Sequence, residues 1–291
     1  MIIENEEFTK IFNKKIFEDS KLRLLQKLAK YPHRYVGIFR PTKPKIKIIQ
    51  NITQSHEIKF GDAMEKIIEV YLSKCGYEIL DKRMVCEDCE YNIDQYVQKD
   101  NKIYFIEQKV RDDHDSTKKR GQIDNFEKKL EQIIKRNPDK DIEAFFYFID
   151  PSLNKNKNYY HSELKNIEDD YSIKCNLCYG KELFELMNIP QVWDELEQNL
   201  IKWRDNLPEF PEFNFDISPL ESFEEIKNLS NNEWRKILSN EKIIDEVFPV
   251  IFPEKQTLKL LYNEFKTRYE MAPKKKAHAA ISEMLKKVTL S

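Results

Sequence analysis

The chain has 291 residues, 40% of them hydrophobic and 34% charged, and its 49 Lys and Arg against 51 Asp and Glu give a net charge of −2. This apolar content excludes a disordered chain, and the near-zero charge means that any affinity for nucleic acid must come from local patches. Five cysteines are too few for a disulfide scaffold, and no apolar run is long enough to span a bilayer. We expect a globular, cytoplasmic protein without membrane contact.

The first part of the chain combines a helical run with a basic arm. Apolar residues recur at helical spacing over residues 10–30, and Pro32 ends the run. Residues 34–52 contain five lysines and arginines, and Pro41 and Pro44 interrupt any helix there, so we expect an extended basic arm. A helical preface and this arm make up the first predicted domain, residues 1–55.

The middle of the chain alternates between helix and strand patterns. A helix is predicted over residues 62–74, followed by Gly76 as its cap, and strands over 77–80, 91–98 and 102–109. A helix over 123–134, strands over 142–149 and 171–178, and helices over 181–187 and 192–203 follow. This order predicts an α/β fold, with a mixed central sheet flanked by helices, at residues 56–206.

The last part of the chain reads as a linker and a helical region, residues 207–291. Pro208, Pro211 and Pro219 interrupt the pattern within residues 207–220. Beyond them, apolar residues return at helical spacing over 223–238, 243–247 and 256–269, and the tail at 274–287 is basic.

The residues best suited to catalysis lie between positions 91 and 122. Glu107 and Lys109 follow four apolar residues, and side chains two apart on a strand share a face. If Asp100 and Asn101 form a two-residue turn, positions that sum to 201 are paired, which sets Asp94 opposite Glu107. Their Cβ atoms would lie about 4.5–5.5 Å apart, close enough for both carboxylates to share Mg²⁺. Such a site suits phosphodiester hydrolysis. The alternative is a solvated ion pair between Glu107 and Lys109.

The stretch after Lys109 is rich in groups that bind phosphates and base edges. We expect a polar loop of about fourteen residues before the next apolar stripe. Its candidate DNA-binding residues are Arg111, His114, Ser116, Thr117, Lys118, Lys119 and Arg120. A charge-compensated surface loop is the alternative interpretation.

The cysteines raise the question of zinc. Cys86 and Cys89, and likewise Cys175 and Cys178, have the spacing of half a four-thiolate Zn²⁺ site, but the 85 residues between the pairs exceed the usual compact range. Alternatively, Cys175 and Cys178 are small apolar residues of a buried strand.

These residues resemble the signature of the PD-(D/E)XK nuclease superfamily. Asp94, followed by Glu107-Gln108-Lys109 after an apolar strand, is similar to its core pattern, and Glu65 resembles the additional helical acid of many members. The stretch VRDDHDSTKKRGQ after the lysine, the later YGKELFE and the chain length are most similar to bacterial type II restriction endonucleases. The resemblance covers roughly residues 60–187. Ile93 stands where the proline of the superfamily's name would be.

One further position carries the resemblance. Gln122 matches a glutamine that some relatives carry on the helix after the lysine, although Phe126 replaces the tyrosine usually found four residues on. By this resemblance Gln122 would belong to the catalytic set, together with Asp94, Glu107, Lys109 and Glu65.

The resemblance implies a restriction-endonuclease-like core and Mg²⁺-dependent cleavage of double-stranded DNA at a short specific sequence, leaving 5′-phosphate ends. Asp94 and Glu107 would hold the metal, Glu65 would support it or a second ion, and Lys109 would serve the attacking water. The polar loop and the basic arm at 34–47 would approach the DNA. It also implies a homodimer and a separate DNA methyltransferase that protects the host.

Two other functions remain open from the sequence. The first is a repair or junction-resolving nuclease of the same superfamily, which would hydrolyse phosphodiester bonds in the same way but serve another biological role. The other is a non-catalytic DNA-binding module that is stabilised by zinc on the four cysteines.

Overall fold

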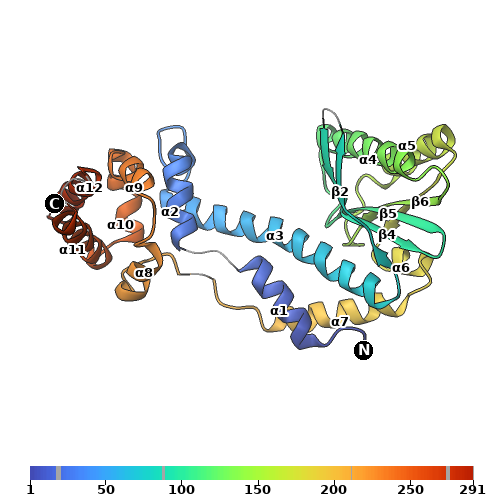
Figure 1. Ribbon diagram of the computed structural model, residues 1–291, viewed down its shortest axis with the longest axis horizontal. Helices are drawn as coiled ribbons and strands as arrows, with labels where there is room; N and C mark the ends of the chain where they lie inside the picture. The colour runs from blue at the N-terminus through green and yellow to red at the C-terminus, as the bar shows by residue number, and fades with distance from the viewer. Residues whose placement is uncertain (18–20, 87–88, 211, 273–275, 291) are drawn as a thin grey trace. The chain divides into compact units, whose positions relative to one another are not determined.

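The computed structural model describes residues 1–17, 21–86, 89–210, 212–272 and 276–290. The chain forms two compact units, and Figure 1 shows their elements. The first unit consists of Met1–Lys15 and Ile58–Leu207, and the second of Ile16–Glu57 and Pro208–Ser291. The long helix α3 (Pro44–Lys74) contributes its N-terminal part to the second unit and the rest to the first.

A five-stranded mixed sheet is the centre of the first unit. In spatial order its strands are β1 (Glu78–Ile79), β4 (Gln95–Lys99), β5 (Lys102–Lys109), β6 (Asp141–Phe148) and β7 (Lys174–Tyr179). β1 and β5 run antiparallel to β4, whereas β6 and β7 run parallel to β5. The α/β fold predicted from the sequence, with helical regions before and after it, is confirmed.

The hairpin of β4 and β5 has the expected register. Gln95 lies opposite Ile106 and Lys99 opposite Lys102, so the paired positions sum to 201 throughout. Asp100 makes the turn possible with a left-handed backbone (φ 55°), a conformation that Asp tolerates better than most residues. This register fixes which side chains of the two strands share a face.

Helices cover both faces of the sheet (Figure 1). Helices α4 (Ser116–Arg136) and α5 (Lys157–Tyr171) lie on one face, where Phe105 of β5 stacks on Phe126 of α4 with ring centroids 4.9 Å apart. Helix α6 (Glu182–Leu186) and the last part of α3 lie on the other face. Helix α7 (Gln191–Asp205) follows α6 along the chain. Because both faces are covered, β5 is apolar on both sides until its final residues.

Helix α1 (Asn5–Ile16) also belongs to this unit. Phe8 and Phe12 are fully buried, and Phe12 meets the rings of Phe60 and Trp203 edge-on. Aromatic side chains of this size bury enough area to attach the helix firmly.

The strand expected over residues 91–98 is in fact two strands. Residues of β3 (Cys89–Asn92) pair with β2 (Arg83–Cys86) in a separate two-stranded sheet, whereas β4 begins at Gln95. Asp94 lies in the gap between β3 and β4. The chain changes sheets here, which a period-two pattern read along one segment does not reveal.

Two further expectations about local structure are wrong. The basic arm is not extended as far as residue 52, because α3 begins at Pro44, and proline is well tolerated in the first turn of a helix. The polar loop after Lys109 ends at Asp115, whose carboxylate accepts a hydrogen bond from the backbone N–H of Lys118 at 2.8 Å and caps α4. Residues 116–120 therefore form the first turns of α4.

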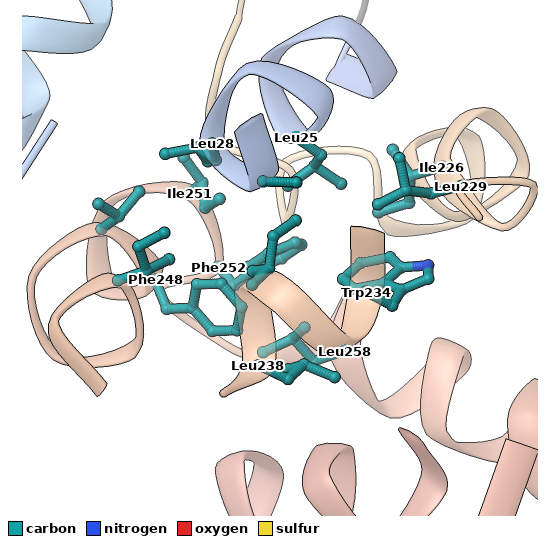
Figure 2. Close-up of a cluster of buried hydrophobic side chains, with 14 of the residues drawn as sticks. Leu25, Leu28, Ile226, Leu229, Trp234, Leu238, Phe248, Ile251, Phe252 and Leu258 are labelled. Carbon is teal, nitrogen blue, oxygen red and sulfur yellow. The ribbon is translucent and has the colours of Figure 1, made fainter. Parts of the chain in front are cut away.

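The second unit is helical and has its own core (Figure 2). Trp234 is fully buried in this core, to which Leu25 and Leu28 of α2 and Phe252, which follows α10, also belong. Its elements besides α3 are α2 (Lys21–Lys30), the short η1 (Pro32–Arg34), α8 (Pro219–Ile226), α9 (Asn231–Leu238), the π-helical η2 (Ile243–Val247), α10 (Phe248–Ile251), α11 (Gln256–Met271) and α12 (Lys276–Leu290). Among the described residues, no helix is both long and apolar enough to cross a membrane.

Candidate active site

Three of the predicted site residues meet at the end of β5. Lys109 is the last residue of this strand, and its Nζ lies 2.7 Å from Oε1 of Glu107 and 3.2 Å from Oδ2 of Asp94. Glu107 and Lys109 share a face because they are two apart on a strand. The hairpin register brings Asp94 to the same place. The structure thus gathers two carboxylates around one ammonium group.

Backbone contacts hold this cluster in place. Oδ2 of Asp94 also accepts a hydrogen bond from the backbone N–H of Gln108 at 2.8 Å, and Lys109 Nζ donates to the Gln108 carbonyl at 3.0 Å. The strand that carries Glu107 and Lys109 is therefore bonded directly to the carboxylate of Asp94. Such a network orients side chains better than an exposed ion pair does, because the partners have little rotamer freedom left.

The second oxygen of Glu107 has a partner that the sequence pattern did not predict. Nζ of Lys129, on α4, lies 2.7 Å from Oε2 of Glu107, and the two side chains are only 6% and 2% exposed. Lys129 follows Phe126 by three residues and Gln122 by seven, so it lies on the inward face of the helix. A lysine at such a position needs an acid opposite it, and this requirement was a usable signal in the sequence.

The charge of Lys109 is maintained by its neighbours. Burial by itself lowers the pKa of a lysine, but attraction and hydrogen bonding by Glu107 and Asp94 outweigh burial and raise the pKa of Lys109 above its ordinary value. The ammonium is therefore fully charged at neutral pH and balances part of the negative charge of the two carboxylates.

Glu65 lies on α3 and is engaged elsewhere. Its carboxylate accepts a hydrogen bond from Lys82, which also donates to Glu69 at 3.1 Å. Burial raises the pKa of Glu65, Lys82 opposes that effect, and the negative charge of Asp94 adds to it. Glu65 is thus close enough to Asp94 to sense its charge, but no described hydrogen bond links it to the Asp94–Glu107–Lys109 cluster.

The donor set suits a hard divalent cation held by two carboxylates. Among the described residues, no three acidic, histidine or cysteine side chains are grouped closely enough to hold a metal by themselves. Mg²⁺, however, is commonly bound by one or two carboxylates, with waters and substrate phosphates completing its shell. Oδ2 of Asp94 and Oε1 of Glu107 already approach one cation, the ammonium of Lys109. This pair therefore fits Mg²⁺, and the role of Glu65 stays a prediction.

Gln122 is not brought to the cluster by any described hydrogen bond. It lies near the start of α4, where its Oε1 accepts a hydrogen bond from the hydroxyl of Tyr160 at 2.7 Å. Tyr160 is fully buried against the aromatic face of the sheet. In this structure Gln122 therefore helps to join α4 to α5, and its catalytic role stays a prediction.

The predicted DNA-binding residues gather at the N-terminus of α4. Ser116, Thr117, Lys118 and Arg120 are exposed on its first turns, whereas Lys119 lies over the ring of Tyr159, 4.3 Å from the centroid. Arg111 is exposed in the segment before the helix. The exposed donors of these residues and the positive end of the helix dipole are favourable for phosphate.

His114 and Asp112 lie in the segment before α4, and the DNA-binding role of His114 stays a prediction. Burial and the charge of Lys118 lower the pKa of His114, so its imidazole is mainly neutral at pH 7. Asp112 is fully buried, and its carboxylate accepts hydrogen bonds from Asn156 and from the hydroxyl of Tyr179, at 2.8 and 2.9 Å. Asp112 thus fixes the segment before α4 to α5 and β7.

The two cysteine pairs lie in different sheets, Cys86 and Cys89 on β2 and β3, and Cys175 and Cys178 on β7. Cys175 and Cys178 are three apart on β7, so their side chains point to opposite faces, which disfavours their binding one ion together. Burial raises the pKa of both thiols to about 12, as expected of reduced, uncharged groups. The side chains of Cys86 and Cys89 lie outside the described part of the structure, so zinc on the four cysteines stays a prediction.

A comparison with protein-family models matches a family of restriction endonucleases. The model described as "Type II restriction endonuclease, HinfI" matches residues 4–85 and 77–204, which together are most of the chain. The matched residues include Asp94, Glu107, Lys109 and Lys129, and they end before the C-terminal helices of the second unit. A search of curated proteins gave no match.

Proposed function

The chain belongs to the HinfI family of type II restriction endonucleases, and on that premise we propose that it hydrolyses both strands of duplex DNA at a short specific sequence with Mg²⁺, leaving 5′-phosphate and 3′-hydroxyl ends. The observation that carries the proposal is the meeting of Asp94 and Glu107 at one ammonium group, that of Lys109. Two carboxylates and a lysine at a strand end are the parts that metal-assisted phosphodiester hydrolysis requires.

Each residue of the cluster has a separate task in this proposal. Oδ2 of Asp94 and Oε1 of Glu107 would hold Mg²⁺, which when bound supplies a Lewis acid for the scissile phosphate and lowers the pKa of a water. Lys109 would then release these oxygens and point its Nζ at the attacking water, where it can orient the lone pair and stabilise developing negative charge.

Because Lys129 binds Oε2 of Glu107, only Oε1 would be available to Mg²⁺. The 2.7 Å contact of Lys129 with Oε2 fixes the carboxylate and turns Oε1 toward Lys109. A carboxylate held by a buried lysine keeps its orientation without help from the substrate, and such preorganisation lowers the cost of assembling the reactive geometry.

The first turns of α4 would bind the DNA backbone next to the cluster. The exposed Lys118 and Arg120 and the helix N-terminus supply positive potential, and Ser116 and Thr117 supply neutral donors. We also propose that two copies act together as a homodimer, because a two-fold assembly presents one centre to each strand, and that a separate methyltransferase protects the host DNA.

The proposal is tested by sequencing the ends of plasmid DNA after incubation with the protein. In Mg²⁺ we expect discrete fragments whose ends share one sequence and are ligated without prior phosphorylation, and in EDTA we expect intact plasmid. Glu107→Gln should leave the plasmid intact in Mg²⁺ as well. Cutting confined to branched DNA would instead identify a junction nuclease, and stoichiometric zinc without any cutting would identify a binding module.

A further inference from the structure

One segment of the second unit is basic in a chain whose overall charge is slightly negative. Residues 21–56 contain nine Lys and Arg and no Asp or Glu, although acidic residues outnumber basic ones in the chain as a whole. A segment with only positive charges, in a chain whose charges otherwise balance, indicates a surface that binds a polyanion.

The tip of this segment exposes two large apolar side chains. In the loop of residues 37–43, here called the apical loop, Ile38 is 86% exposed and Phe39 is 91% exposed. These two neighbours contribute almost nothing to the core of the protein, and an exposed aromatic next to an exposed aliphatic side chain is unfavourable in water. A partner that covers both would remove this cost.

The apical loop is anchored by buried residues on both sides and by a hydrogen bond inside the loop. Tyr35 and Val36 before it, and Ile48 on α3 after it, are buried in the core of the second unit. Gly37 has a φ of 126°, which other residues rarely adopt, and its carbonyl accepts a hydrogen bond from the N–H of Arg40 at 3.1 Å. The tip is therefore presented from an ordered base.

The cations around the tip lack acidic partners. Arg34, Arg40, Lys43 and Lys45 are exposed, and within the described part of the chain none of the four is paired with a carboxylate. By contrast, Arg268 in the same unit pairs with Glu264 at 2.7 Å. Arg34 instead stacks on the ring of Tyr31, 4.3 Å from the centroid, and Nε of Arg40 donates to the His33 carbonyl. Phosphates would relieve the repulsion among these four charges.

We propose that the apical loop is a DNA-binding wedge, in which Ile38 and Phe39 insert between base pairs while Arg34, Arg40, Lys43 and Lys45 contact the flanking phosphates. Apolar wedges between cations are a recurring way to unstack and bend a duplex. The inference rests on the proposed function only in taking duplex DNA as the substrate. It assigns part of DNA recognition to the second unit rather than to the sheet that carries Glu107 and Lys109.

The first test measures binding by the full-length chain in EDTA, where no cleavage occurs. The probe is a fluorescently labelled duplex of mixed sequence, and the readout is anisotropy. The double variant Ile38→Ser/Phe39→Ser should bind about tenfold more weakly, a loss of about 1.4 kcal/mol, because it removes the side chains that stack on the bases. Met271→Ser, which changes an 83% exposed apolar side chain of the same unit, is the matched control and should bind normally. Wild-type affinity of the double variant would overturn the proposal.

Two further measurements locate the contact. In Phe39→Trp, the new indole should be accessible to acrylamide in the free protein and protected when the duplex is added. Arg40→Ala/Lys43→Ala should reduce the slope of log affinity against log salt by nearly two, about 0.9 for each phosphate that the variant no longer neutralises. Lys259→Ala/Lys266→Ala, from exposed positions on α11, should leave the slope unchanged. An indole that stays accessible on DNA would contradict insertion.

These outcomes are separable from those of the proposed function. If the wild type cuts DNA in Mg²⁺ but the apical-loop variants bind like the wild type, the wedge is refuted and the nuclease stands. If the wild type binds DNA through the apical loop but never cuts it, the nuclease proposal is refuted and the wedge stands. Loop-dependent association with anionic lipid vesicles, and none with duplex DNA, would also overturn the wedge.

Discussion

Lys129 of α4 and Glu107 of β5 form a buried ion pair, with Nζ 2.7 Å from Oε2. The helix and the strand are held together partly by this contact, and it joins the hydrophobic core to the Asp94–Glu107–Lys109 cluster. Because the other oxygen of Glu107 meets Lys109, the carboxylate lies between a lysine of the core and a lysine of the site.

Replacing Lys129 tests this connection. In Lys129→Met, Glu107 keeps only one cationic partner inside the protein, so we expect the free energy of unfolding to fall by about 3 kcal/mol and the rate of plasmid cleavage to drop. Urea denaturation and single-turnover cleavage are the measurements. Lys128→Met, which changes an exposed neighbour on the same helix, should alter neither. Unchanged stability of Lys129→Met would show that the pair has no structural role.

Arg120 tests the DNA contact of α4. It is exposed on the early turns of the helix, so Arg120→Ala should weaken duplex binding and lower the salt slope by about 0.9, with the same effect for different sequences if the contact is to phosphate. Electrophoretic shifts at several salt concentrations measure both quantities. Lys135→Ala, at the far end of the same helix, is the control. Normal binding by Arg120→Ala would remove this end of α4 from the interface.

Glu143 on β6 gives a pH-dependent contribution to stability. Burial raises its pKa, but hydrogen bonds from Lys102, Lys174 and Asn176 outweigh burial and lower it. A lowered carboxylate pKa stabilises the fold at pH values above the ordinary Glu value, and this stabilisation disappears as the pH falls through the lowered pKa. Glu143→Gln should therefore be less stable at pH 7 by roughly 1–2 kcal/mol, and the difference should shrink below about pH 4.

Urea denaturation across pH measures this effect. Exposed Glu197 supplies the control, because Glu197→Gln should follow the wild type at every pH. A stability difference for Glu143→Gln that stays constant down to about pH 2, well below the ordinary Glu pKa, would mean that packing rather than charge is responsible.

The approach of Asp94 to the end of β5 could be predicted because it depends only on local rules. A turn at Asp100 and Asn101 fixes the register, and a strand repeats its faces every two residues, so the pairing follows over a short distance. The same reasoning located Lys109 beside both acids.

Lys129 and Asp112 could not be located in that way. Their partners, Glu107 and Tyr179, are 22 and 67 positions away, and each contact depends on how a helix or a distant strand packs on the sheet. Sequence periodicity shows that a residue faces inward, but it does not show what it faces. Asp112 also lies in a polar stretch whose composition favours a surface loop.

The errors at the basic arm and at the polar loop have an identifiable cause. By composition Pro44 resembles a helix breaker and residues 116–120 resemble a loop, although both positions suit the start of a helix. Asp115 three residues before Lys118 is an N-cap arrangement, and proline in the first turn is favourable. Polar composition outweighed these signals because the apolar stripe of α4 begins only at Ile123.

The central claim is that Asp94 and Glu107 hold the metal that cleavage requires, and Asp94→Asn tests it most directly. The change keeps the shape of the side chain and removes its charge. Single-turnover cleavage of plasmid DNA in Mg²⁺ should disappear, while duplex binding in EDTA and the unfolding transition persist. Asp100→Asn, at the turn of the same hairpin, should cut normally. Cleavage by Asp94→Asn at the rate of the wild type would contradict the account.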